Sequence, residues 1–410
     1  MEITTIIIVN DFAHVQGGAG QVALTSALAL AKSNYKVILF TAVPPVDSNL
    51  LDENLEVICL DQHEILKDPN RLNAAVQGLW NIKAARSMSS LLERQNPNTT
   101  VIHLHSWTKA LSSSIVRTAI KNNFRIVCTM HDYFLACPNG GFYDYKDESI
   151  CHLTPLSTKC LLKNCDVRSY PQKLWRVTRQ MIQQRIGLLP RGIKNFIAIS
   201  EFSRKILDEY LPHGAHVYPV DNPIDITDVG PISVAKNHEY VFVGRLSKEK
   251  GGHLLAEASL ELGVQATFIG DGYTREEILH INPNIYITGW LPRQNVITSL
   301  QRARTLVFPS MWYETQGLVV AEASALGIPA IVANTSAAKD AIIDGKTGLL
   351  FKSGNTDDLL EKMKMLLDDK YVEKLGLNAY TKYWSSPMTI EKHVQQLELC
   401  YKQVLSNDAT

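Results

Sequence analysis

The sequence predicts an α/β fold made of two doubly wound, Rossmann-like domains that face each other across a cleft. Short apolar, β-branched runs alternate with helix-like segments in both halves of the chain. A segment with four prolines, 211–237, separates the halves. Glycines and charged residues follow several of the runs, at the strand ends where such sheets bind ligands.

Composition limits the classes of function. With 410 residues, 45% hydrophobic and 20% charged, the chain can bury two large cores. Its 41 basic and 41 acidic residues cancel, so no overall field draws it to nucleic acid. No run is long enough to span a membrane, and no basic segment precedes the first apolar run. Cys59, Cys128 and Cys400 lie in apolar contexts typical of reduced thiols, so we expect a cytoplasmic protein.

In the first half, residues 4–9 predict a buried strand, and Gly17-Gly18 begins an alanine-rich helix that ends near residue 32. Further strands are predicted at 36–41, 55–60, 100–105, 125–129 and 195–200, with helices within 70–94, at 108–121 and after residue 200. This order favours a parallel sheet with helices on both faces.

The glycines at the start of the first helix let backbone N–H groups approach a phosphate closely. Gly18-x-Gly20-x-x-Ala23 also resembles a dinucleotide fingerprint, which would indicate a dehydrogenase. Two features oppose that interpretation. The glycines begin eight residues after the strand, and no acidic residue follows the second strand before Asp47.

Histidines follow two neighbouring strands of this half. His131-Asp132 comes after the strand at 125–129, and His105 ends the strand at 100–105. Because strand ends face the ligand in this fold, we interpret His131 as functional and not as a structural histidine. For His105 both interpretations stay open.

A cysteine-rich insertion is predicted at 137–165. Its cysteines are Cys137, Cys151, Cys160 and Cys165, at a spacing that matches no common zinc finger. In a reducing compartment such a cluster more often binds zinc than forms disulfides. The four either hold a structural zinc that braces a loop or are unrelated thiols.

Residues 172–194 carry six basic and no acidic side chains, with apolar residues at helical spacing between them. Such a helix either lies on an anionic membrane surface or packs on its own domain. We favour packing on the domain.

The second half, from residue 220, opens with a strand at 239–243 that ends in Gly244-Arg245, and Lys250 follows before a helix. This spacing directs two cations to one point above the sheet, where they would neutralise a diphosphate. Gly270 follows a strand at 265–269, and Trp290-Leu291 follows one at 284–288.

The most informative stretch is a strand, an aromatic turn and a helix over 307–327. A helix that starts near Gly317 leaves its first N–H groups free for an anion. Glu322 then lies about 7–8 Å along the helix axis among apolar residues, where a nucleotide's ribose would satisfy it. The alternative is a neighbouring arginine. Glu314 precedes the helix, on the side where a sugar beyond the phosphates would lie.

Phe308-Pro-Ser-x-Trp-Tyr-Glu314-x7-Glu322 resembles the E-x7-E signature of the retaining glycosyltransferases of family GT4, whose fold is GT-B, and Arg245 and Lys250 match that family as well. The resemblance implies transfer of a sugar from a UDP- or GDP-linked donor to a glycan or lipid-linked acceptor, without a catalytic metal. It also implies work in polysaccharide or lipopolysaccharide assembly. The basic segment at 172–194 is the feature that would give peripheral contact with the inner face of the plasma membrane. The predicted domains are 1–219 and 220–385, with a helix at 386–410 that returns to the first domain.

Residue roles also follow from the resemblance. It implies that Glu314, His131, Arg245 and Lys250 act at the reacting centre, with the Arg and Lys on the diphosphate. The implied donor-binding residues are Gly17, Gly18, Gly244, Gly270, Trp290, Leu291, Thr315, Gln316, Gly317, Leu318 and Glu322. Pro223 stands where the family usually has glycine, so that turn is given no role.

Two other classes share this architecture. A nucleotide-sugar epimerase or sugar phosphorylase would process its substrate without an acceptor. A non-catalytic binding subunit should have lost its charged cleft residues, and all four of Arg245, Lys250, Glu314 and Glu322 are present. We therefore rank the binding subunit last.

Overall fold

The computed structural model describes residues 2–407, which group into two compact units. The first unit contains residues up to 140, 153–223 and those from 388 onward. The second contains 141–152 and 224–387. The cysteine-rich insertion is thus divided between the two units.

The first unit is built on a seven-stranded parallel sheet with the order β3-β2-β1-β4-β5-β8-β9. Its strands are β1 Thr5–Val9, β2 Lys36–Thr41, β3 Leu55–Cys59, β4 Thr100–Leu104, β5 Arg125–Thr129, β8 Asn195–Ala198 and β9 His216–Pro219. The inner strand β1 is buried along its length because helices cover both faces of the sheet, which explains its continuous run of isoleucines.

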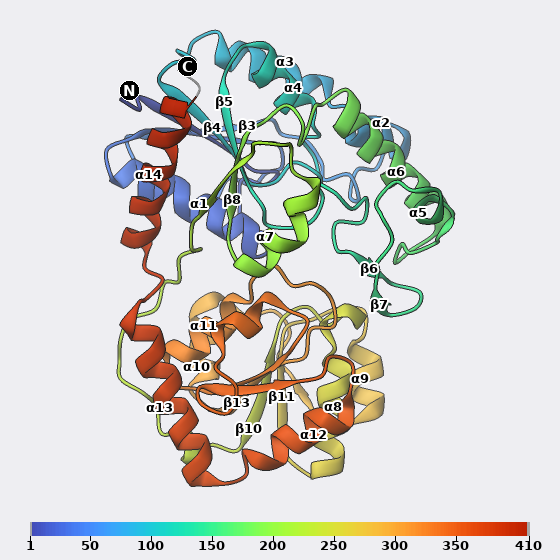
Figure 1. Cartoon of the computed structure of the whole chain (residues 1–410), viewed down its shortest axis with the longest axis vertical. Coiled ribbons are helices and arrows are strands. Elements are labelled where there is room, and N and C mark those ends of the chain that lie inside the picture. The colour runs from blue at the N-terminus through green and yellow to red at the C-terminus, as the bar shows by residue number, and fades with distance from the viewer. Residues whose placement is uncertain (1, 408–410) are drawn as a thin grey trace. The chain divides into compact units, whose positions relative to one another are not determined.

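The helices of this unit are α1 Gly17–Lys32, α2 Arg71–Leu79, α3 Ile82–Leu92, α4 Ser114–Lys121, α5 Thr158–Leu162, α6 Tyr170–Arg185, α7 Glu201–Leu207 and α14 Ile390–Asn407. Figure 1 shows α14 (red) beside α1 (blue), and the two helices pack against each other. Helix α4 begins six residues later than the sequence predicted, after Ser112 adopts a positive φ of 65°.

Helix α6 packs on its own unit, but with the opposite face from the one that its apolar spacing predicts. Lys173 and Arg179 are buried, whereas Leu174, Met181 and Ile186 at its end are exposed. The basic side chains turn inward because polar partners lie there: cysteine thiols for Lys173 and backbone carbonyls for Arg179. Lys173 and Arg179 therefore take no part in an outward basic face, whereas Arg185, Arg191 and Lys194 are exposed.

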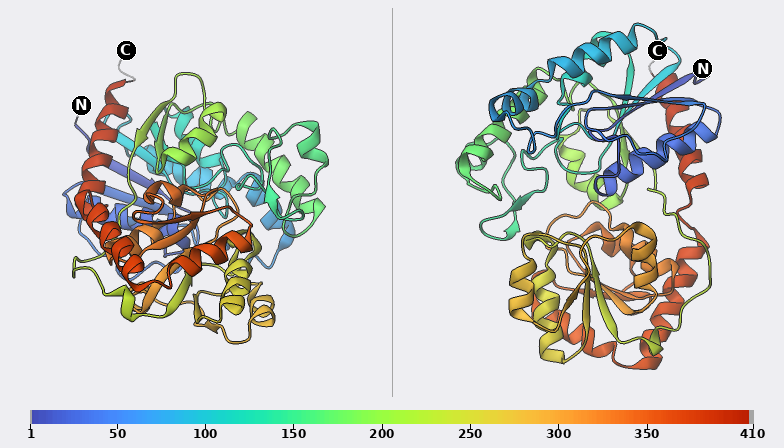
Figure 2. Two further views of the ribbon diagram at one scale, coloured as in Figure 1. Left: turned by 60° about the horizontal axis from the view of Figure 1, so that its bottom comes forward. Right: turned by 180° about the vertical axis from the view of Figure 1, so that it is seen from behind.

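The second unit has a six-stranded parallel sheet with the order β12-β11-β10-β13-β14-β15. Its strands are β10 Glu239–Val243, β11 Ala266–Ile269, β12 Tyr286–Ile287, β13 Ala303–Phe308, β14 Ala330–Ala333 and β15 Gly348–Phe351. Its helices are α8 Gly252–Leu262, α9 Arg275–Ile281, α10 Arg293–Leu300, α11 Leu318–Ala325, α12 Thr356–Met365 and α13 Asp369–Ser385. They lie on both faces of the sheet (Figure 2). A short antiparallel pair, β6 Tyr143–Asp144 and β7 Ser149–Ile150, belongs to the same unit.

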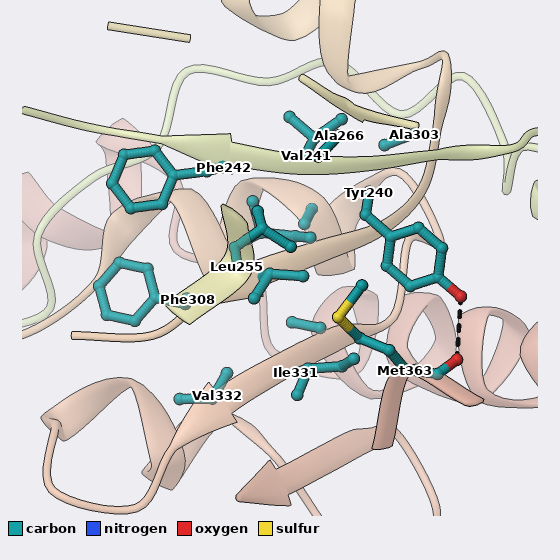
Figure 3. Close-up of a cluster of buried hydrophobic side chains, with 14 of the residues drawn as sticks. Tyr240, Val241, Phe242, Leu255, Ala266, Ala303, Phe308, Ile331, Val332 and Met363 are labelled. Carbon is teal, nitrogen blue, oxygen red and sulfur yellow. Dashed lines mark hydrogen bonds between the residues drawn. The ribbon is translucent and has the colours of Figure 1, made fainter. Parts of the chain in front are cut away.

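The core of the second unit lies between this sheet and its helices. Figure 3 shows Leu255 of α8 beneath the sheet, close to side chains of β10, β13 and β14. Tyr240 is fully buried, and its hydroxyl donates a hydrogen bond of 2.9 Å to the Met363 carbonyl oxygen. This bond satisfies the one polar atom that the tyrosine brings into the core.

The two parallel sheets confirm the predicted fold class. Between residues 2 and 407, no helix is both long enough and apolar enough to cross a membrane.

Candidate active site

The loop that follows β10 holds Arg245 through a buried carboxylate. The Arg245 guanidinium donates to Glu249 Oε1 at 2.9 Å, and the Ser247 hydroxyl donates to the same oxygen at 2.8 Å. The Glu249 side chain is only 2% exposed, whereas that of Arg245 is 55% exposed. Glu249 therefore holds one edge of the guanidinium of an arginine that is otherwise largely exposed to solvent.

Lys250, which ends the same loop, forms an ion pair with Glu314. Its Nζ lies 2.5 Å from Glu314 Oε2, and the Ser310 hydroxyl and Trp312 indole N–H donate to that same oxygen at 2.9 and 2.8 Å. Burial alone would raise the pKa of Glu314, but Lys250 and these hydrogen bonds outweigh it and lower the pKa. The carboxylate is therefore ionised and fixed in position.

Backbone contacts explain why these two loops meet. The Met311 N–H donates to the Glu249 carbonyl oxygen at 2.8 Å. A Cβ on Gly251 would lie 2.1 Å from the Pro309 carbonyl oxygen, so only glycine allows the loop after β10 to pass so close to the end of β13. The structure thus brings Lys250 to the turn that leads into α11.

Glu322 lies on α11 and is nearly buried, with its side chain 7% exposed. Its Oε1 accepts a hydrogen bond of 2.6 Å from Arg293 at the start of α10. An arginine partner was the structural alternative that the sequence left open for this glutamate. The pair stabilises a charge that an apolar helix would otherwise not tolerate.

The remaining donor residues predicted in the second unit lie around these pairs. Gly317 caps α11 with φ 113°, and Gly244 and Gly270 approach so closely that a Cβ on Gly270 would lie 1.9 Å from the Gly244 carbonyl oxygen. Trp290 is 67% exposed, and Leu291 beside it is half-buried. Thr315, Gln316 and Leu318, which flank Gly317, are half-buried.

In the first unit, His131 lies at the end of β5 within a group of histidines. Its Nε2 is 2.9 Å from Nδ1 of His105, and the two rings stack. Burial, with a smaller contribution from His393, lowers the pKa of His131 to about 3. His131 is therefore a neutral hydrogen-bonding group near neutral pH. Burial also raises the pKa of the adjacent Asp132 to about 6.

Gly17 and Gly18 open α1 in the first unit. No atom lies within 4 Å of the Cβ that a larger residue would place at either position, and Gly17 has φ 75°. The surroundings of these two backbone groups are therefore open in the first unit.

The sequence left open whether the four cysteines hold a structural zinc or are unrelated thiols, and the described part of the chain gives no support to the zinc site. Among residues 2–407, no group of three or more His, Cys, Asp and Glu side chains is arranged to hold a metal ion. Instead, the buried Lys173 ammonium donates to Cys165 Sγ at 3.1 Å and to Cys160 Sγ at 3.6 Å. A lysine cation thus lies between two of the thiols that a zinc ion would need as ligands.

Sequence reasoning missed Glu249 and Arg293. Glu249 is one of several charged residues after β10, and nothing in the local pattern marks it as the buried one. Arg293 begins a helix far from Glu322 in the chain, so only the folded structure pairs them. A buried glutamate on an apolar helix was the available signal that some cation must lie opposite.

Two protein-family models match the chain: that of Glycosyltransferase Family 4 over residues 16–228 and that of Glycosyl transferases group 1 over residues 231–382. A sulfoquinovosyl transferase from Arabidopsis thaliana is 33% identical over 141 residues, which cover 33% of this chain and 28% of the relative. The match thus spans little more than a quarter of that protein.

Solved structures extend the likeness to the whole chain. Sucrose-phosphate synthase from Thermosynechococcus elongatus superposes with a TM-score of 0.72 at 16% identity, over 98% of this chain and 99% of that one. HepE from Anabaena, solved in complex with UDP and glucose, has a TM-score of 0.68 at 16% identity, over 98% of this chain and all of its own.

Proposed function

This chain belongs to glycosyltransferase family 4 and has the GT-B fold, and from this premise we propose that it transfers a sugar from a nucleoside diphosphate sugar to an acceptor with retention at the anomeric carbon. The observation that carries the proposal is the Lys250–Glu314 ion pair at the start of α11. It joins a cation for phosphate, a fixed carboxylate and a helix N-terminus in one place.

This arrangement suggests which residues bind each part of the donor. Arg245 and Lys250 bind the diphosphate together with the first N–H groups of α11, which have no carbonyl partner inside the helix. Both cations are held by carboxylates, Glu249 and Glu314. Donor binding exchanges at least one of these pairs for phosphate.

Further contacts hold the nucleoside and the sugar. Glu322 binds the ribose and keeps its ion pair with Arg293. Trp290-Leu291 lies against the base. Glu314 and the neutral His131 hydrogen-bond the transferred sugar, and Gly17-Gly18 approaches the donor phosphate or the acceptor.

In the transfer step, the bond from the anomeric carbon to the phosphate oxygen breaks and the bond to the acceptor oxygen forms on the same face of the sugar. The departing phosphate oxygen takes the acceptor's proton. Arg245 and Lys250 neutralise the charge that develops on the leaving nucleoside diphosphate. This step does not need the paired carboxylates of a retaining hydrolase.

We further propose a glycan or lipid-linked acceptor, used in cell-surface polysaccharide or lipopolysaccharide assembly at the cytoplasmic face of the membrane. The donor is tested first, because donor binding can be measured without an acceptor. UDP-, GDP-, ADP- and dTDP-sugars are compared by thermal shift, beginning with UDP-glucose because HepE was solved with UDP and glucose.

One nucleotide series should raise the unfolding temperature, since ligand at about 100 times Kd stabilises by about 2.7 kcal/mol. No shift with any member of the panel would contradict the proposal. Conversion of the donor without an acceptor would instead indicate an epimerase or, with phosphate, a phosphorylase.

A further inference from the structure

The inward face of α6 carries three basic residues whose charges are compensated to different degrees. The Lys173 ammonium donates a hydrogen bond to the Cys165 thiol, and Arg176 forms an ion pair of 2.9 Å with the buried Asp166. Arg179 forms no ion pair within residues 2–407, although it is only 8% exposed. Burying an arginine without a carboxylate is costly, so a compensating group is expected beside it.

Arg179 is held in a fixed position. Its guanidinium lies 4.9 Å from the Phe134 ring centre and 5.3 Å from that of Trp175, and it donates to the Thr108 and Pro138 carbonyl oxygens at 3.1 and 3.4 Å. Its buried Nε has no hydrogen-bond partner in the described chain. The arginine is therefore fixed by ring and carbonyl contacts, with no carboxylate of the described residues against it.

A cavity of about 140 Å³ adjoins this arginine. Four cations line it, Lys109, Arg168, Arg176 and Arg179, against the single carboxylate of Glu64. Glu64 is itself paired with Lys67 at 3.5 Å, and Asp166 is shared by two of the arginines. Asp132 and Asp11 act on Arg179 only through space. Positive charge is therefore in excess at the cavity wall.

A larger cavity of about 480 Å³ adjoins the first one. Phe12, His14, Asp61 and His63 line it, and Glu64 lines both cavities. The Lys109 ammonium lies 5.4 Å from the Phe12 ring centre, which joins the two linings. Phe12, Asp61, Lys109 and Phe134 of these linings follow strands β1, β3, β4 and β5, at the edge of the sheet where α/β folds bind ligands, whereas the three arginines come from α6 and the segment before it.

We propose that the smaller cavity binds the anionic group, a carboxylate or a phosphate, of an acidic acceptor whose neighbouring sugar occupies the larger cavity. The small volume suits one charged group and not a whole glycan, since sites for complete small molecules are about 300–1,000 Å³. The inference rests on the proposed transferase function, for which it names the acceptor class as acidic. It assigns Arg168, Arg176 and Arg179 to acceptor specificity.

The test is isothermal titration calorimetry with glucuronate, glucose 6-phosphate and glucose, at saturating UDP so that the diphosphate site is filled. At least one acidic sugar should bind about tenfold more tightly than glucose, and the better of the two identifies a carboxylate or a phosphate. The double variant Lys109→Gln/Arg168→Gln removes two exposed members of the lining and should reduce that preference about tenfold.

The control is Arg185→Gln, which changes an exposed arginine at the end of α6 outside the lining and should keep the preference. Unchanged UDP affinity of the double variant shows that it is folded. Equal binding of acidic and neutral sugars by the wild type would overturn the inference. So would a double variant that keeps the preference, with or without a loss of thermal stability, since Lys109 and Arg168 would then take no part in binding the anion.

A second measurement distinguishes failure of the transferase proposal from failure of the anion-cavity proposal. If UDP does not bind, the acidic preference is measured without nucleotide in Lys250→Ala, where the other basic site is disabled. A preference that persists there supports the anion cavity while the transferase proposal falls.

Discussion

At the residue scale, one oxygen of Glu314 accepts hydrogen bonds from three side chains, Lys250, Ser310 and Trp312. This concentration of donors lowers the pKa of the carboxyl group and fixes its direction. The lysine also lies 5.3 Å from the Trp312 ring centre, so an aromatic face helps to hold the cation. Such preorganisation is what electrostatic catalysis requires.

The change Lys250→Ala should lower kcat about 100- to 1,000-fold, because a cation that faces the leaving diphosphate is lost. Ser310 and Trp312 still donate to Glu314, so the fold should remain. Initial-rate kinetics, together with circular dichroism, measures both effects. The control is Lys248→Ala in the same turn, whose ammonium instead pairs with Glu277 and Glu148. A similar loss in both variants would contradict the role given to Lys250.

The residues that the sequence could reveal are those with a fixed local spacing. Lys250 follows Arg245 at a set interval, and Glu322 follows Glu314 across one turn and the start of a helix, so a short motif describes each pair. The partners Glu249 and Arg293 had no such spacing, because they are selected by three-dimensional contact. Whether a charged side chain is buried depends on loops from elsewhere in the chain.

At the element scale, α11 depends on its first glycine. Gly317 has φ 113°, and a Cβ there would lie 2.7 Å from the Ala338 Cβ, so both conformation and space exclude a side chain. The sequence predicted this start closely because glycine, proline and small residues mark both ends of the helix.

The change Gly317→Ala should destabilise the protein by about 1–3 kcal/mol and weaken UDP binding, because the turn before α11 must shift. Thermal unfolding and calorimetry measure the two effects. Gly18→Ala is the stability control, since no atom lies within 4 Å of its new Cβ. Its unfolding temperature should not fall. An unaltered unfolding temperature for Gly317→Ala would show that the turn adapts freely.

For helix α6 the sequence predicted the helix but not the face that is buried. Its existence followed from helical spacing, but the spacing of its apolar residues predicted the wrong face. Hydrophobic periodicity assumes that a helix packs on an apolar surface. Here the surface beneath consists of thiols, carbonyls, Asp166 and a cavity, so the basic side chains are buried instead.

At the scale of the whole molecule, the first unit is assembled from segments far apart in the chain. His393 of α14 contacts the Ser26 hydroxyl of α1 at 2.8 Å and the Asp221 carbonyl oxygen at 2.7 Å. Tyr401 of α14 contacts His103 of β4 at 2.7 Å. The fold class was predictable from alternation alone, whereas these histidine contacts were not, because they join residues hundreds of positions apart.

These histidines make stability depend on pH. Burial lowers the pKa of His393 to about 4 and that of His131 to about 3, from an ordinary value of 6.5. Below pH 6.5 the unfolded chain therefore binds protons that the folded chain does not, and stability falls as pH falls, by about 1.4 kcal/mol per pH unit for each such group. Asp132, with its raised pKa, acts in the opposite direction and offsets part of the loss.

Thermal unfolding at pH 7 and pH 5 tests this dependence. His393→Asn should be less stable than the wild type at pH 7 but should lose less stability at pH 5, since one buried titrating group is gone. The exposed His213→Asn is the control and should behave as the wild type. An equal loss in His393→Asn and the wild type would exclude a contribution from this histidine.

The division of the chain between the units has a consequence for its synthesis. The core of the first unit includes Val394, Leu397 and Leu405, and the core of the second includes Tyr143. A ribosome therefore releases the first unit's sheet long before the helix that completes its packing. Separate expression of 1–223 and 224–410 would remove a core segment from each half, so neither fragment should fold by itself.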